Sequence, residues 1–187
     1  LYWCMSYNTK AVPKSDLPET WEDLLTQPRW RGGRLAINNL PQLWLLPLMG
    51  RNGTEWTKNY LKKLFDDVKP QLRKEGANAL SNLVMAGEFD AGIPAADYRI
   101  SLYVPKGAPI SWHCPAPVPS AISEMAILKG TPNIDAARLF ANWLLSKEGQ
   151  IAQFYAEHAT PIHQDLQTQE FLTFPYELVG KQLAFRS

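Results

Sequence analysis

Short apolar runs alternate with helical segments along most of this sequence, and this alternation limits the possible fold more than any other feature. The runs at 1–8, 35–37, 89–93, 98–104, 110–114 and 122–128 have the length and pattern of β-strands. Helices are expected over 41–50, 54–68, 76–87, 131–144 and 147–157. Strands that alternate with helices are typical of the α/β class, in which helices cover both faces of a sheet of parallel strands. The sequence therefore predicts an α/β fold.

The charge and hydropathy of the chain disfavour several kinds of partner. The 187 residues include 19 Lys and Arg and 18 Asp and Glu, and a net charge of +1 creates no field that attracts nucleic acid or an anionic membrane. No apolar run approaches the roughly 20 residues of a membrane span. The chain opens on Leu1–Tyr7, an apolar run without a basic leader, which indicates a processed or truncated chain whose targeting segment is not present.

The sequence carries no recognisable catalytic or cofactor-binding motif. His113, His158 and His163 lack the spacing of a metal motif such as HExxH, so structural or surface roles are expected for them. Ser, His and Asp all occur, but the GxSxG turn of a hydrolase nucleophile is absent. The glycine-containing turns match neither a phosphate-binding loop nor a dinucleotide fingerprint. We therefore expect a protein that is not an enzyme and needs no cofactor.

Several segments follow one another in an order that is typical of one protein family. They are Tyr7-Asn8-Thr9, Asp16–Leu25, Trp30–Ile37, Gly87-Glu88 and Phe140–Gln150. Together they resemble the bacterial extracellular solute-binding proteins of ABC importers, family 1, and in particular the group of ferric-iron-binding proteins. The resemblance covers residues 7 to about 160, and the order and spacing of the segments are more specific than any single one.

The resemblance implies a type II periplasmic-binding fold, in which two α/β lobes joined by two crossing strands clamp a ligand. Because family members are usually much longer, the chain is expected to be a C-terminal fragment with a complete second lobe, the hinge strands and part of the first lobe. The expected parts are 1–8 as the first crossing strand, 9–107 as the ligand-binding second lobe, 108–118 as the return crossing strand, 119–150 as the remnant of lobe one, and 151–187 as a C-terminal helical segment that packs back on the lobes.

A binding lobe of this kind needs hydrogen-bond donors around a cleft, and helix N-termini supply them for anions. Asn38 and Asn39 lie between a predicted strand and a predicted helix, which is where open α/β sheets bind ligands, and Asn78 lies in the first turn of another helix. Tyr7, in the first matched segment, is a further candidate. The alternatives are helix capping for the Asn pair and a solvated surface position for Asn78.

The segment Asp97-Tyr98-Arg99 bears most directly on the ligand. In ferric-iron members of the family, adjacent tyrosines near this position supply phenolate ligands, whereas here one tyrosine precedes a cation. A guanidinium repels Fe³⁺ but pairs with carboxylate or phosphate through two hydrogen bonds. We therefore predict an anionic organic or phosphate-bearing ligand, anchored by Arg99 with Tyr98 as a donor. If iron is the ligand instead, Tyr98 and Asp97 would hold it; alternatively, Arg99 forms only a surface salt bridge with Asp97 or Glu88.

The resemblance also implies a possible pairing of the two cysteines. Cys4 and Cys114 lie in the segments assigned to the two crossing strands, which run side by side in the family. A disulfide between them requires Cα atoms within about 7 Å and an oxidising compartment such as the periplasm. The alternative is two buried free thiols.

By resemblance, the chain is expected to be a monomeric periplasmic protein that closes around its ligand and delivers it to an ABC permease in the membrane. Its partners would be a small anionic solute and that permease, with no nucleic acid. An effector-binding domain of a transcriptional regulator is the alternative from another class, although the helix-turn-helix that normally precedes such a domain is absent from this sequence. An enzyme built on the same lobes is a third possibility, disfavoured by the lack of catalytic motifs.

Overall fold

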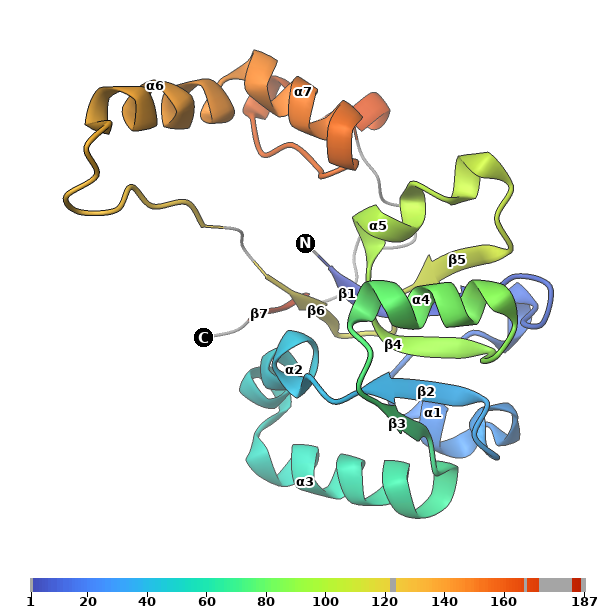
Figure 1. The fold of residues 1–187 in the computed structure, drawn as a ribbon. Helices are drawn as coiled ribbons and strands as arrows, with labels where there is room; N and C mark the ends of the chain where they lie inside the picture. Colours follow the sequence, from blue (N-terminus) through green and yellow to red (C-terminus); the bar gives the residue numbers. More distant parts are fainter. Residues whose placement is uncertain (1, 122–123, 167, 172–182, 186–187) are drawn as a thin grey trace.

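The centre of the molecule is a five-stranded sheet with the order β3-β2-β4-β1-β5 (Figure 1). The computed structural model describes residues 2–121, 124–166, 168–171 and 183–185. The strands of the sheet are β1 (Trp3–Asn8), β2 (Leu35–Asn38), β3 (Gln71–Arg73), β4 (Ala91–Ala96) and β5 (Ile110–His113). β2 is parallel to β3 and β4, but β1 is antiparallel to both of its neighbours, β4 and β5. The expectation of parallel strands is therefore wrong for β1.

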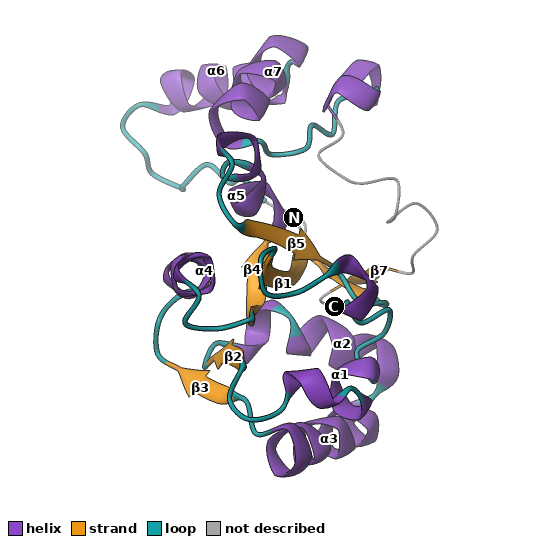
Figure 2. Ribbon diagram, turned by 90° about the vertical axis from the view of Figure 1, so that its right-hand side faces the viewer, coloured by secondary structure: helices purple, strands orange, loops and turns teal. Residues whose placement is uncertain are grey.

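Helices cover both faces of this sheet, which confirms the α/β class. Their bounds are α1 (Asp23–Thr26), α2 (Leu45–Asn52), α3 (Thr54–Lys63), α4 (Ala77–Ala86), α5 (Asp97–Ser101), α6 (Ile134–Leu145) and α7 (Lys147–Glu157). Figure 2 shows α1, α2 and α3 on one side of the sheet and α4 on the other. A π-helical turn, Leu64–Val68, continues α3, so the helix predicted over 54–68 is confirmed in extent.

The short strand β2 shows how the sequence pattern builds the core. Leu35 and Ile37 belong to the hydrophobic cluster beneath α1, α2 and α3, whereas Ala36 belongs to the cluster beneath α4 and α5. Successive side chains of a strand point to opposite faces, so all residues of a strand covered on both sides become buried. The larger cluster also holds Trp21 and Trp44, whose rings stack with centroids 5.1 Å apart.

Two strand predictions are wrong, and each error has a structural reason. Residues 98–104 form most of α5 and the turns that follow it, because Asp97 begins a helix whose buried apolar residue is Ile100. The predicted strand at 122–128 is absent from its described part: Glu124–Leu128 has no regular structure, and residues 122 and 123 lie outside the described residues. The strand of this region is β6 (Val118–Ser120), which pairs in parallel with β7 (Leu183–Phe185).

The helices α6 and α7 stand apart from the sheet in Figure 1. α7 begins at Lys147 as predicted, and it is capped by the preceding Ser146, whose hydroxyl oxygen accepts the Gly149 backbone N–H at 3.1 Å. No residue of α6 is buried, and its exposed apolar side chains include Leu139, Phe140 and Trp143. The remainder of the expected C-terminal helical segment holds the single turns Gln164–Leu166 and Gln169–Phe171, while 172–182, 186 and 187 lie outside the described residues.

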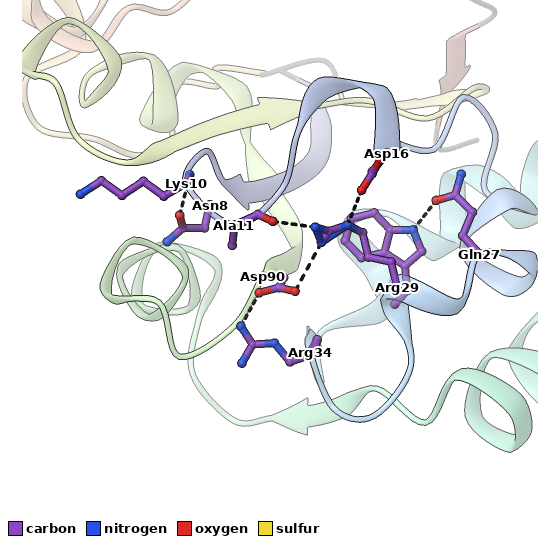
Figure 3. A network of polar contacts seen from close by, with 9 residues as sticks. Asn8, Lys10, Ala11, Asp16, Gln27, Arg29, Arg34 and Asp90 are labelled. Carbon is purple, nitrogen blue, oxygen red and sulfur yellow. Dashed lines mark hydrogen bonds and ion pairs between the residues drawn. The ribbon is translucent and has the colours of Figure 1, made fainter.

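The buried carboxylate of Asp90 lies at the end of the sheet where β4 begins, within a network of polar contacts (Figure 3). Asp90 is only 7% exposed; it forms an ion pair with Arg34, and its other oxygen lies 3.7 Å from Nη1 of Arg29. Arg29 in turn bonds Asp16 at 3.0 Å and the Ala11 carbonyl at 2.6 Å. This network fastens the loop after β1 to the loop before β2.

Replacing Asp90 by alanine is expected to lower the free energy of unfolding by about 2–3 kcal/mol, because two guanidinium groups lose a buried partner. Urea unfolding followed by tryptophan fluorescence measures this loss. Asp66→Ala is the control, since Asp66 pairs with Lys62 on an exposed face of the helix and should leave the unfolding midpoint unchanged. Equal midpoints for the two variants would show that the Asp90 network contributes nothing to stability.

Candidate ligand-binding site

The carboxyl ends of three parallel strands meet at one edge of the sheet. Asn38, the last residue of β2, pairs with Arg73, the last residue of β3, and β4 runs alongside β2. The first residue of β1, Trp3, pairs with Ala96 at the end of β4, so the start of β1 lies at the same edge. The helices α4 and α5 begin just after β3 and β4. Open α/β sheets bind ligands at such an edge.

Asn38 contributes a buried donor to this edge. The residue is only 2% exposed, and its Oδ1 accepts the Leu40 backbone N–H at 3.1 Å in a local turn. Its Nδ2 has no hydrogen-bond partner among the described residues. Helix capping does not account for it, because the N-cap of α2 is Trp44, and no side-chain hydrogen bond caps that helix. A buried amide without an acceptor is costly, so this atom is suited to a ligand oxygen.

Arg99 contributes a second buried donor. Its Nε is buried and has no partner among the residues that the structure describes. The guanidinium carbon lies 5.4 Å from the centroid of the Tyr98 ring, and both side chains are half-buried. Within the same residues no ion pair joins Arg99 to Asp97 or Glu88, and Glu88 lies 3.6 Å from Arg73 instead. The structure therefore leaves the guanidinium available for an anion.

Asp97 is oriented toward the protein interior. It is 2% exposed, and its carboxylate accepts the Tyr2 backbone N–H at 3.2 Å. Burial raises the pKa of this carboxyl above its ordinary value, and hydrogen bonds from the backbone N–H groups of Tyr2 and Tyr98 oppose that rise. The pKa of the Tyr2 phenol is also raised, first by the burial of that phenol and then by the nearby charge of Asp97. The Asp97 side chain is thus bound to the backbone at the start of β1.

The remaining candidate residues lie at opposite ends of the sheet. Asn39 is exposed at the edge, where its backbone N–H donates to the Arg73 carbonyl at 2.9 Å. Asn78 is an exposed residue of the first turn of α4. Tyr7 is 3% exposed in the larger core cluster and pairs with Ala91 at the beginning of β4. The edge therefore gathers Asn38, Asn39, Asn78, Tyr98 and Arg99, and the structure places Tyr7 at the opposite end.

One charged residue of the edge is not identified by the sequence pattern. Arg73 ends β3, a three-residue edge strand whose polar sequence gives no strand signal. Its guanidinium bonds Glu75 at 2.7 Å and lies 5.3 Å from the centroid of the Phe89 ring. The hydrogen bond with Arg73 lowers the pKa of Glu75. Because Arg73 is already paired with carboxylates, Arg99 is the better anion anchor.

A disulfide joins Cys4 of β1 to Cys114, the residue that follows β5. The Cα atoms are 4.5 Å apart, and both cysteines are buried. The register that pairs Met5 with His113 places the two cysteines opposite one another at the end of the β1–β5 ladder. The disulfide therefore links β1, the first strand of the sheet in the sequence, to the end of β5, the last.

The described part of the chain contains neither a metal-binding cluster nor a membrane-spanning helix. In that part no three or more His, Cys, Asp or Glu side chains are grouped so as to hold a metal ion. Nor does any helix there have the length and apolar character needed to cross a bilayer.

The fold is that of the periplasmic binding proteins. The family model for bacterial extracellular solute-binding proteins matches residues 2–151, and the chain belongs to this family. An uncharacterized protein of Haemophilus influenzae is 32% identical over 160 residues, which cover 76% of this chain and 42% of that protein.

Solved structures of the same fold include two with bound ligands. Iron-bound HitA from Pseudomonas aeruginosa matches with a TM-score of 0.74 and 21% identity, over 98% of this chain and 61% of HitA. The periplasmic binding protein AfuA from Actinobacillus pleuropneumoniae, with exogenous fructose-6-phosphate bound, matches with a TM-score of 0.69 and 25% identity, over 97% of this chain and 58% of AfuA. The chain thus spans less than two thirds of the length of these relatives.

Proposed function

We propose that this chain is part of the periplasmic solute-binding component of an ABC transporter, and that its ligand is a small anionic, phosphate-bearing solute. The observation that carries the proposal is a pair of buried donors, Asn38 Nδ2 and Arg99 Nε, which have no acceptor among the described residues and come from elements that meet at one sheet edge. Oxygen atoms of an anion would satisfy both donors, and a guanidinium binds phosphate through two parallel hydrogen bonds.

Two observations favour a phosphate-bearing ligand over ferric iron. AfuA, at 25% sequence identity, has fructose-6-phosphate bound, whereas iron-bound HitA has a higher TM-score but only 21% sequence identity and supports the fold alone. In addition, the Asp97 carboxylate, which would be one of the two iron ligands, is buried and bonded to the Tyr2 backbone. A free guanidinium beside the remaining Tyr98 would repel a trivalent cation.

Binding in this proposal needs no bond chemistry. Arg99 anchors the anionic group, Tyr98 donates a further hydrogen bond, and Asn38, Asn39 and Asn78 contact other ligand oxygens beside the N-terminus of α4. The segment 9–107 acts as the binding lobe, with 1–8 and 108–118 as the crossing strands. The residues 119–150 are a remnant of the other lobe, and 151–187 form a segment that packs back on the lobes. Closure of the lobes around the ligand then produces the form that docks, as a monomer, on the membrane permease.

A thermal-shift screen tests the proposed ligand class. The panel contains sugar phosphates, inorganic phosphate, phosphonates, carboxylates, polyamines and ferric iron. Because a ligand that binds only the folded state raises the melting temperature, phosphate-bearing compounds are expected to raise it and the other classes are not. A rise with ferric iron alone would favour the iron alternative and overturn the proposal.

Replacing Asn38 by aspartate is expected to weaken fructose 6-phosphate binding about tenfold, because a carboxylate oxygen takes the place of the donor Nδ2 and faces the anion. Isothermal titration measures the change. Asn59→Asp is the matched control, since Asn59 is exposed on α3 and its replacement adds the same charge away from the edge. Equal losses in the two variants would mean that net charge, rather than the Asn38 donor, determines binding.

A further inference from the structure

Asp97 connects three elements of the binding edge through its backbone and its side chain. Its carboxylate accepts the Tyr2 N–H at 3.2 Å, and its own N–H donates to the Tyr2 carbonyl at 3.4 Å. Its carbonyl accepts the Ser101 hydroxyl at 3.0 Å, and the oxygen of that hydroxyl accepts the Trp112 indole N–H at 3.1 Å. Asp97 therefore links the start of β1, the whole of α5 and the strand β5.

The helix α5, which carries Arg99, is too short to be stable without tertiary contacts. α5 has five residues, and helices shorter than roughly 12 residues are marginal without tertiary contacts. Among the described residues, the contacts that hold it include the two-bond link from Asp97 to Tyr2, the fully buried side chain of Ile100, and the bond between Ser101 and Trp112. The first of these fixes the residue at which α5 begins, directly before Tyr98.

We propose that Asp97 is a positioning residue for ligand binding, which fixes the first turn of α5 to β1 and so directs Arg99 to the edge where Asn38 lies. The proposal rests on the proposed function of that edge. Asp97 itself does not contact the ligand, because its carboxylate is buried against the backbone and a second negative charge would repel an anion.

The test compares Asp97→Ala with Asp97→Asn, using fructose 6-phosphate as the probe in isothermal titration. The alanine variant loses the bond to Tyr2 and is expected to bind at least tenfold more weakly, since small displacements of an anchor cost large factors. The asparagine variant keeps an acceptor oxygen of the same size and is expected to bind within about threefold of the unchanged chain. In an Arg99→Ala background, Asp97→Ala should cause no further loss, because Asp97 acts through Arg99.

Asp90→Ala is the matched structural control. Asp90 directly precedes β4 and Asp97 directly follows it, so both are buried carboxylates at opposite ends of one strand. The control should lower the melting temperature but leave the affinity for fructose 6-phosphate unchanged. An equal loss of affinity in both alanine variants would show that Asp97 acts only through global stability, and would overturn the proposal.

Hydrogen exchange provides a readout that does not depend on the ligand. The amides of residues 97–101 should exchange at least tenfold faster in Asp97→Ala than in Asp97→Asn. Equal exchange in the two variants would overturn the positioning role whatever the affinities are. If the unchanged chain binds no phosphate-bearing probe while exchange follows the expected pattern, the proposed function fails and the role of Asp97 in holding α5 stands.

Discussion

Replacing Arg99 by alanine is expected to weaken the binding of fructose 6-phosphate by roughly 30- to 100-fold, or about 2–3 kcal/mol. The guanidinium forms no ion pair among the described residues, and its Nε is buried without an acceptor. The ligand would therefore supply its main anionic partner, and truncation would remove a charge-assisted contact from a partly desolvated site. Isothermal titration measures the affinity, and thermal unfolding should show little change because no internal ion pair is lost.

Two further variants make this result specific. Arg99→Lys keeps the charge but loses the planar fork, so it should recover only part of the affinity. Arg138→Ala removes a cation from α6, where its partner is the exposed Asp135, and should leave the affinity unchanged. An Arg99→Ala variant that binds as tightly as the unchanged chain would remove Arg99 from the site.

Removing the disulfide is expected to cause the largest loss of stability, about 4 kcal/mol in the free energy of unfolding. The bond between Cys4 and Cys114 closes a loop with a sequence separation of 110 residues, and the chain entropy that such a bond removes from the unfolded state grows with loop length. The variant is Cys4→Ala with Cys114→Ala, compared with the unchanged chain in urea with and without a reducing agent.

The reducing agent supplies the control for this prediction. Reduced chain and double variant should unfold at similar urea concentrations, both well below the oxidised chain. Alkylation followed by mass spectrometry shows the state of the thiols in the oxidised sample. Two alkylated cysteines before reduction, or one common unfolding midpoint for all three samples, would contradict the prediction.

The sequence predicts the elements whose signal is local. The apolar stripe of 54–68 gives α3 and its continuation, and Ser146 marks the start of α7, because both depend on residues within a few positions of one another. Two strands that depend on pairing with a distant strand are not predicted. β3 is a polar edge strand that exists through pairing with β2, and β6 pairs with β7, more than 60 positions later.

The candidate site shows the same division between local and distant information. Asn38 and Arg99 are identified because a strand end and a departure from a family motif are visible in the sequence. In the part of the chain that the structure describes, neither Asn38 Nδ2 nor Arg99 Nε has a partner. The inward orientation of Asp97 depends on Tyr2, 95 positions away, and the place of Arg73 beside Asn38 depends on β3, a strand that the pattern does not reveal. The position of Tyr7 follows from the register of β1 against β4, which composition and spacing do not fix.

The proposed site for an anionic, phosphate-bearing solute is the edge formed by the carboxyl ends of β2, β3 and β4. An amide chemical-shift titration of this chain with fructose 6-phosphate locates the binding residues. Saturable shifts are expected, concentrated in residues 38–40, 76–79 and 97–101. An absence of saturable shifts, or saturable shifts confined to other parts of the sheet, would contradict the proposed site.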